Sequence, residues 1–174
     1  MTLVEKFSTL ILNNVILKGA INMEQNQKLV QGLQEIVTGL SQQADGHNIQ
    51  SKIFSAQGFS KLGEKYAEHV AEERGYVDQC INRILDLGGE VKNAAKIETP
   101  VYTDPIEWIK YDLQVSKDGL AWLATLVEEA KDDFTTFDIL KEYYKDEEND
   151  MYWGEQQSEL IEKIGRQNWL NMQI

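Results

Sequence analysis

The sequence GGEVKNAAKIETPVYTDP, residues 88–105, separates two pairs of predicted helices and limits how those pairs can be connected. The glycine pair at its start stops the preceding helix, and helical periodicity is then lost up to Thr103. Asp104 supplies an N-cap side chain, and Pro105 suits the first position of the next helix. A connection of about 15 residues can span roughly 50 Å when extended. Because a helix of about 30 residues is only roughly 45 Å long, the connection can run the full length of a helix bundle.

Helical periodicity predicts two long helices before this connection, two after it, and a short fifth helix at the end. The first three helices are expected at about 23–54, about 59–87 and 105 to about 131. The fourth is expected to start after Thr136, with Asp138 in its first turn, and to end at about 164. The short fifth helix is expected at 166–174. Few residues join the helices within each pair, so each pair is predicted to be an antiparallel hairpin. The fold class is therefore all-α, with two hairpins joined by a long crossover.

Composition limits the classes of protein to which the chain can belong. A chain of 174 residues with 42% hydrophobic residues is long and apolar enough for one globular domain. The formal net charge of -12 argues against nucleic acid or an anionic membrane as a partner. The lone Cys80 excludes an intrachain disulfide and lies in an apolar helical stretch. No stretch of about 18 uncharged apolar residues predicts a membrane span.

The first 22 residues form an apolar segment that we treat as an N-terminal extension to a bundle domain at residues 23–174. No basic region precedes the apolar residues, and Glu5 interrupts them early, so the segment does not read as a signal peptide. We expect a cytoplasmic protein whose extension packs against its own bundle or against a neighbouring subunit.

Three stretches resemble bacterioferritin. The closing residues 160–174, LIEKIGRQNWLNMQI, are similar to the end of that family's subunits, where a glycine leads into a short fifth helix. Residues 78–89 resemble the end of the family's second helix, and residues 145–150 lie where its second metal motif falls. The resemblance covers roughly residues 25–174. It implies a ferritin-like four-helix bundle, a hollow shell of many subunits, and a role in iron storage.

The family's di-iron centre follows the pattern Glu, Glu-x-x-His, Glu, Glu-x-x-His, one element from each long helix. A spacing of three places both ligands of a motif on one inward face. The matching positions here are Leu40, Glu73, Tyr76, Ser116, Glu147 and Asp150. Two of the six ligand types remain. The resemblance therefore implies no active ferroxidase and no assigned catalytic residue, although iron can still be the cargo.

The family's haem is held by a methionine directly after the glutamate of the second helix. Here that position is Arg74, which has no thioether to offer. We expect no haem at this position.

Three interpretations of the remaining polar residues are left open. In the first, Glu73, Tyr76, Ser116, Glu147 and Asp150 form a metal-free hydrogen-bonded network, joined by His69 or His47. In the second, a weaker metal site uses Glu73, Glu147 and Asp150, with His69 one turn earlier on the same helix face. In the third, Arg74 forms a salt bridge to Glu73 in place of iron.

Glu68 and Glu72 flank the predicted site on the second helix. By the resemblance, nearby positions face the shell cavity, where acidic groups bind and nucleate iron. Taken alone, the two residues are better explained as an ordinary solvated helix face.

Three functions follow. The first is a structural or storage subunit, assembled with copies of itself or with an active ferritin-like partner. The second is an enzyme that oxidises iron or handles peroxide at an altered carboxylate site. The third is a small non-catalytic interaction protein, in which the N-terminal extension covers the surface that shells use.

Overall fold

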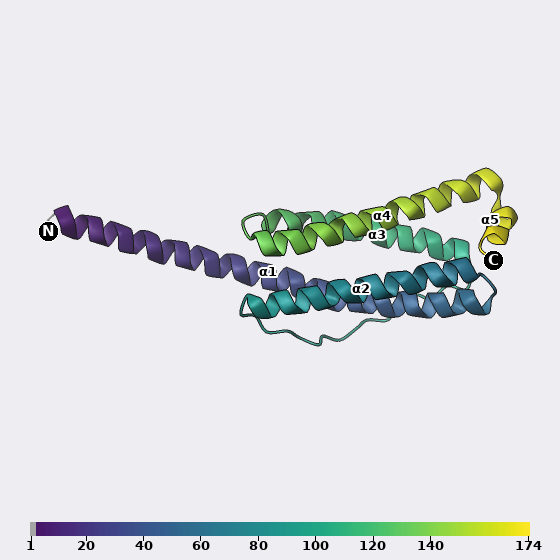
Figure 1. The fold of residues 1–174 in the computed structure, drawn as a ribbon, viewed down its shortest axis with the longest axis horizontal. Coiled ribbons are helices and arrows are strands. Elements are labelled where there is room, and N and C mark those ends of the chain that lie inside the picture. Colours follow the sequence, from purple (N-terminus) through teal and green to yellow (C-terminus); the bar gives the residue numbers. More distant parts are fainter. Residues whose placement is uncertain (1–2) are drawn as a thin grey trace.

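A computed structural model describes the backbone from residue 3 and the side chains from Met23 onward. Within that range the chain is all-helical: α1 (Leu3–Ala56), α2 (Ser60–Asp86), α3 (Pro105–Glu129), α4 (Phe134–Ile164) and α5 (Arg166–Met172). Contacts pair α1 with α2 and α3 with α4. Figure 1 shows the two hairpins side by side, connected by a long irregular crossover that runs along the outer side of the α1–α2 hairpin. The predicted ferritin-like four-helix bundle with a short fifth helix is confirmed.

The first helix begins at Leu3 rather than near Met23. The predicted packing of residues 1–22 lies outside the side chains that the structure describes.

The crossover from residue 87 to 104 follows α1, and a row of glutamines on α1 bonds its backbone. Gln34 donates to the Lys92 carbonyl at 3.0 Å and accepts from the Lys92 amide at 2.7 Å. Gln50, which is 1% exposed, makes the same double contact with Tyr102, both at 2.9 Å. Gln42 and Gln57 add single bonds. The glutamines lie about two helical turns apart and therefore share one face. They satisfy backbone groups that have no regular structure of their own.

Side-chain caps set the starts of α3 and α4. Asp104 accepts from the Ile106 amide at 2.9 Å, and Pro105 opens α3, as predicted. At α4 the capping residue is Asp133, because the helix begins at Phe134, earlier than the predicted start after Thr136.

The cap of α4 also ties that helix to α2. Asp133 accepts from the Thr136 amide at 3.1 Å and also from Arg83 of α2 at 2.6 Å. The same aspartate thus fixes both the start of the helix and its contact with the other hairpin. Between α4 and α5, Gly165 has φ +78°, a conformation that a side chain would strain.

The bundle core consists of two apolar clusters separated along the helix axes. The first holds the α1 residues from Leu29 to Leu40 together with Ile84, Leu126 and Leu140. The second lies toward the other end, around Phe54, Leu62, Tyr66, Ile109 and Trp169. Each of the four long helices carries polar residues between its contributions to the two clusters. A buried polar layer therefore crosses the middle of the bundle.

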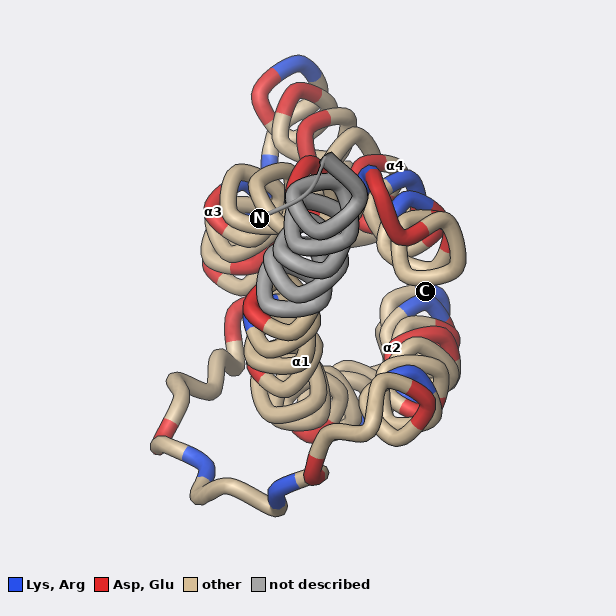
Figure 2. The backbone as a smooth tube through the Cα atoms, turned by 90° about the vertical axis from the view of Figure 1, so that its left-hand side faces the viewer, with Lys and Arg blue, Asp and Glu red and all other residues tan. Residues whose placement is uncertain are grey.

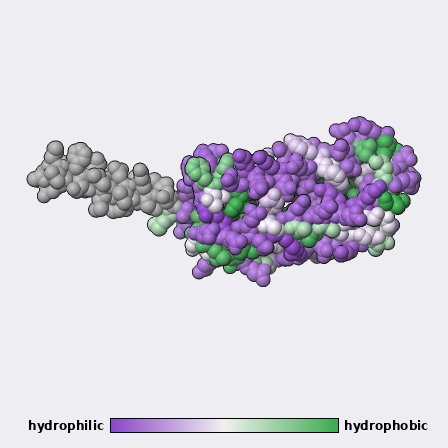
Figure 3. Space-filling model, viewed as in Figure 1, coloured by the Kyte–Doolittle hydropathy of each residue, from purple (hydrophilic) through white to green (hydrophobic). Residues whose placement is uncertain are grey.

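The surface is acidic and mostly polar. Figure 2 shows acidic residues on all four long helices, and the face seen in Figure 3 is largely hydrophilic, with hydrophobic residues near α5 and at the opposite end of the bundle. Among the residues that the structure describes, no helix is long and apolar enough to cross a bilayer.

Candidate functional site

The polar layer gathers titratable groups from all four long helices. Its members are His47 of α1, His69 and Glu73 of α2, Asp112 and Ser116 of α3, and Glu147 and Asp150 of α4. All are buried except Asp112 and Asp150, which are half-buried. Burying charges in a bundle core is costly unless they pair, so this layer is the candidate functional site.

His47 lies between two carboxylates from two other helices. Its Nε2 is 3.0 Å from Asp112 Oδ1, and its Nδ1 is 2.8 Å from Glu73 Oε1. The Nδ1 contact is close enough for an ion pair but is not aligned as a hydrogen bond. Burial opposes a charge on the ring, but Asp112 and Glu73 outweigh it and raise the pKa of His47 to about 10. The ring is therefore an imidazolium at neutral pH, and it links α1, α2 and α3.

The carboxylate partners of His47 have different surroundings. Tyr66 donates its hydroxyl to Asp112 Oδ2 at 3.0 Å, so both oxygens of Asp112 are bonded. Burial raises the pKa of Glu73, and His47 opposes that rise. Glu73 Oε2 is buried without a protein partner.

Glu147 is the group in the layer most suited to hold a proton near neutral pH. Burial raises its pKa to about 7, helped by the charges of Asp150 and Glu73, and a hydrogen bond from Ser116 opposes the rise.

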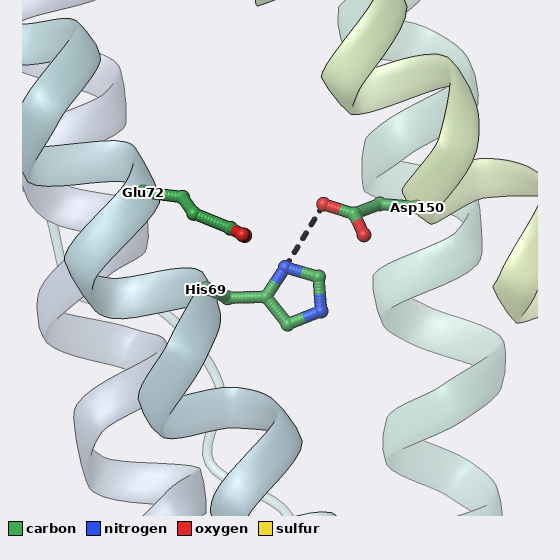
Figure 4. A group of neighbouring side chains, drawn as sticks. All are labelled: His69, Glu72 and Asp150. Atoms are coloured by element: carbon green, nitrogen blue, oxygen red, sulfur yellow. Dashed lines mark ion pairs between the residues drawn. The ribbon is translucent and has the colours of Figure 1, made fainter.

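His69 forms the other half of the layer, at the seam between α2 and α4. Its Nδ1 is 2.9 Å from Asp150 Oδ2, and Lys65 Nζ is 3.2 Å from Asp150 Oδ1. Burial raises the pKa of Asp150, but His69 and Lys65 outweigh it, so the net shift is downward. Glu72 points toward the same His69–Asp150 pair (Figure 4), and one ligand atom from each of these three residues lies within 4.8 Å of the others.

The structure separates the sequence-predicted residues into different surroundings. Leu40 packs in the first apolar cluster, and Ser116 is buried beside Glu147. Tyr76 is half-buried and stacks on Tyr143 with ring centroids 5.0 Å apart, outside the polar layer. Glu68 is exposed and is not part of the grouping with Asp150.

The predicted metal set of Glu73, Glu147 and Asp150 is not the set that the structure groups around a common point. Asp150 lies with His69 and Glu72, whereas His47 engages Glu73. Both histidines belong to the layer, but each pairs with different carboxylates.

The proposed salt bridge from Arg74 to Glu73 is wrong. Arg74 lies on the surface and pairs with Asp45 of α1 at 2.8 Å, and Lys96 of the crossover pairs with the same aspartate. Neighbouring positions on a helix point about 100° apart, so Arg74 faces solvent when Glu73 faces the core.

Sequence reasoning missed Asp112 and Lys65. Asp112 lies one turn before Ser116 on α3, and this spacing of four would have placed it on the same inward face. Lys65 lies one turn before His69 on α2, so the same rule would have found it.

Comparison with known proteins gives consistent matches. A family described as "Ferritin-like domain" matches residues 30–164. A bacterial ferritin of Neisseria meningitidis serogroup B is 36% identical over 156 residues, covering 87% of this chain and all of that protein. A bacterial ferritin of Pseudomonas aeruginosa is 35% identical with the same coverage. One from Synechocystis is 32% identical over 154 residues, covering 82% of this chain and 93% of that protein.

Proposed function

The chain belongs to the ferritin-like family, and from that premise we propose that it is an iron-storage shell subunit without the usual di-iron ferroxidase centre. The observation that carries the proposal is the position of the His47 ring, 2.8 Å from Glu73 and 3.0 Å from Asp112. In the family pattern, the carboxylate at the Glu73 position is a metal ligand. Here a side-chain cation occupies the neighbourhood of that carboxylate.

The charge on His47 disfavours a metal at Glu73 for an electrostatic reason. A divalent ion bound to Glu73 would lie close to the imidazolium, and like charges at short range in a buried site repel strongly. The ion would also have to replace an ion pair of 2.8 Å that the fold already provides.

The remaining positions do not restore the lost donors. Leu40 is packed in an apolar cluster and has no lone pair. Ser116 offers a neutral hydroxyl where the family has a carboxylate, and Tyr76 lies outside the polar layer. We infer that these residues do not fit a di-iron centre, because hard cations need several oxygen or nitrogen donors converging on one point.

The residue at the family's haem-binding position also lacks a donor atom for iron. The residue at the haem-binding position, Arg74, carries a guanidinium that pairs with Asp45 at the surface. A guanidinium has no lone pair for iron.

The proposed shell role rests on the extent of the resemblance. The chain covers the full length of the Neisseria and Pseudomonas relatives and keeps the short helix α5. We propose that it assembles with copies of itself, or with a ferritin-like partner that oxidises Fe(II). Its net charge of -12 would then raise the local concentration of iron cations.

The test is an anaerobic titration of the purified chain with Fe(II), followed by addition of oxygen, with assembly size measured by light scattering. We expect a large homo-assembly, or assembly on mixing with a ferritin-like subunit, and oxidation no faster than in buffer. Rapid oxidation with about two irons per chain, in line with a paired-metal site, would overturn the proposal. The variant Glu73→Gln is the matched control, because a ferroxidase that used Glu73 would lose rate and a subunit without the centre would not.

A further inference from the structure

We propose that His69, Glu72 and Asp150 form a site for one divalent transition-metal cation at the seam between α2 and α4. The site shares only Asp150 with the family's ligand positions. It does not depend on shell assembly or on iron storage, and it can be tested on the chain at any assembly size.

The three donors have the chemistry and the spacing that such a cation needs. An imidazole nitrogen with two carboxylate oxygens suits borderline cations such as Fe(II), Co(II) and Zn(II). The ligand atoms lie within 4.8 Å of one another. A cation bound at about 2.1 Å draws its ligands to roughly 3–4 Å apart, so small side-chain rotations close the site.

The helices hold the donors on the required sides. His69 and Glu72 are three residues apart on α2 and therefore share one face, and Asp150 meets them from α4. His69 is 4% exposed, so packing fixes its ring, whereas Glu72 is exposed to solvent. The site thus has one buried ligand, His69, and one exposed ligand, Glu72.

A cation at this site would take the place of a proton on His69. Nδ1 lies 2.9 Å from Asp150 Oδ2, a contact that favours a proton on Nδ1 when no cation is bound. Nε2 is buried and has no hydrogen-bond partner in the protein. A cation that binds both Nδ1 and Oδ2 would replace the proton between them, and the ring would keep its other proton on Nε2.

Lys65 limits the affinity of the site. Its ammonium lies 3.2 Å from Asp150 Oδ1, the oxygen of that carboxylate that does not face His69. The lysine does not contact Oδ2, the oxygen that faces His69, but its charge would repel a cation bound there. Removing the lysine charge should therefore strengthen binding, an outcome that a purely structural role of the cluster would not produce.

The experiment is a titration of the full chain with Co(II), followed by visible absorption and equilibrium dialysis. We expect one Co(II) per chain. His69→Gln and Asp150→Asn should each weaken binding by about 10-fold or more, and Glu72→Gln should weaken it measurably. Lys65→Gln should tighten it several-fold. Glu68→Gln, an exposed carboxylate on the same helix outside the grouping, is the matched control and should change nothing.

Two outcomes would overturn the inference. One is the absence of stoichiometric Co(II) binding by the wild type. The other is binding that survives Glu72→Gln, His69→Gln and Asp150→Asn unchanged. Because Glu72 is exposed, its variant should fold even if a buried variant does not. Fast iron oxidation would refute the proposed storage role and leave this site untouched, so the two tests fail separately.

Discussion

The two histidines of the chain lie in one polar layer, yet their surroundings differ in almost every respect. His47 has a carboxylate at each ring nitrogen, on two different helices, and its pKa is raised to about 10. His69 has a carboxylate at one nitrogen, no partner at the other, and an exposed glutamate beside it. His47 is a cation held in place by carboxylates from two other helices. His69 is a candidate ligand, because it lies beside one half-buried carboxylate and one exposed carboxylate.

Replacing each histidine with glutamine should separate these roles most strongly. His47→Gln leaves the buried Glu73 and the half-buried Asp112 without a cation, and we expect a loss of about 3–5 kcal/mol in the free energy of unfolding. His69→Gln should cost less, about 1–2 kcal/mol, because Asp150 keeps its contact with Lys65.

The measurement is urea unfolding at pH 7 and matched protein concentration, since assembly also affects stability. Equal losses for the two variants would mean that the environments do not differ energetically, and the comparison would fail.

The pH dependence of the free energy of unfolding should reveal the protonation of Glu147, the buried carboxyl of α4 that lies in the polar layer with both histidines. Folding raises the pKa of Glu147 from 4.5 to about 7. A raised carboxyl pKa contributes stability that is complete below about pH 4.5 and is lost as pH rises through about 7. Glu147→Gln should therefore be more stable than the wild type above pH 7, by up to roughly 3 kcal/mol.

Unfolding of both proteins at pH 5 and pH 8 checks this prediction. Unfolded His47 titrates within that range, but it does so in both proteins, so its contribution cancels in the stability difference between them. A stability difference that is the same at both pH values would show that Glu147 stays charged in the fold.

The smallest effect is expected for an ion pair outside the layer. Arg74 and Asp45 are about half exposed, and Lys96 also contacts Asp45. Arg74→Ala should change the free energy of unfolding by less than about 1 kcal/mol, because solvent screens exposed pairs. A loss close to that of His47→Gln, measured in the same urea experiment, would mean that burial does not set the size of these effects.

The main features of the fold followed from local patterns. The Asp104-Pro105 start of α3 and the glycine before α5 were read from residue types that prefer those positions. The start of α4 was predicted after Thr136, a few residues too late, because several acidic and hydroxyl residues lie close together there. Asp133 is the cap that also reaches Arg83 of α2, a contact that local sequence does not contain.

The site could be predicted only in part. Helical spacing correctly brought Glu73, Glu147 and Asp150 to the inside of the bundle. It could not say which partner each would take. The contact between His47 and Asp112 joins residues 65 positions apart, and it depends on the distance between two helices in different hairpins.

The sequence by itself determined the helical fold class and the long crossover, and it predicted the loss of four of the six ligand types, since these depend on residue type and spacing along one chain. Only the tertiary structure decided that one histidine lies between two carboxylates of the layer while the other lies beside Asp150 and the exposed Glu72. Charge pairing depends on distances across the bundle of a few ångströms, and the packing of four helices sets those distances.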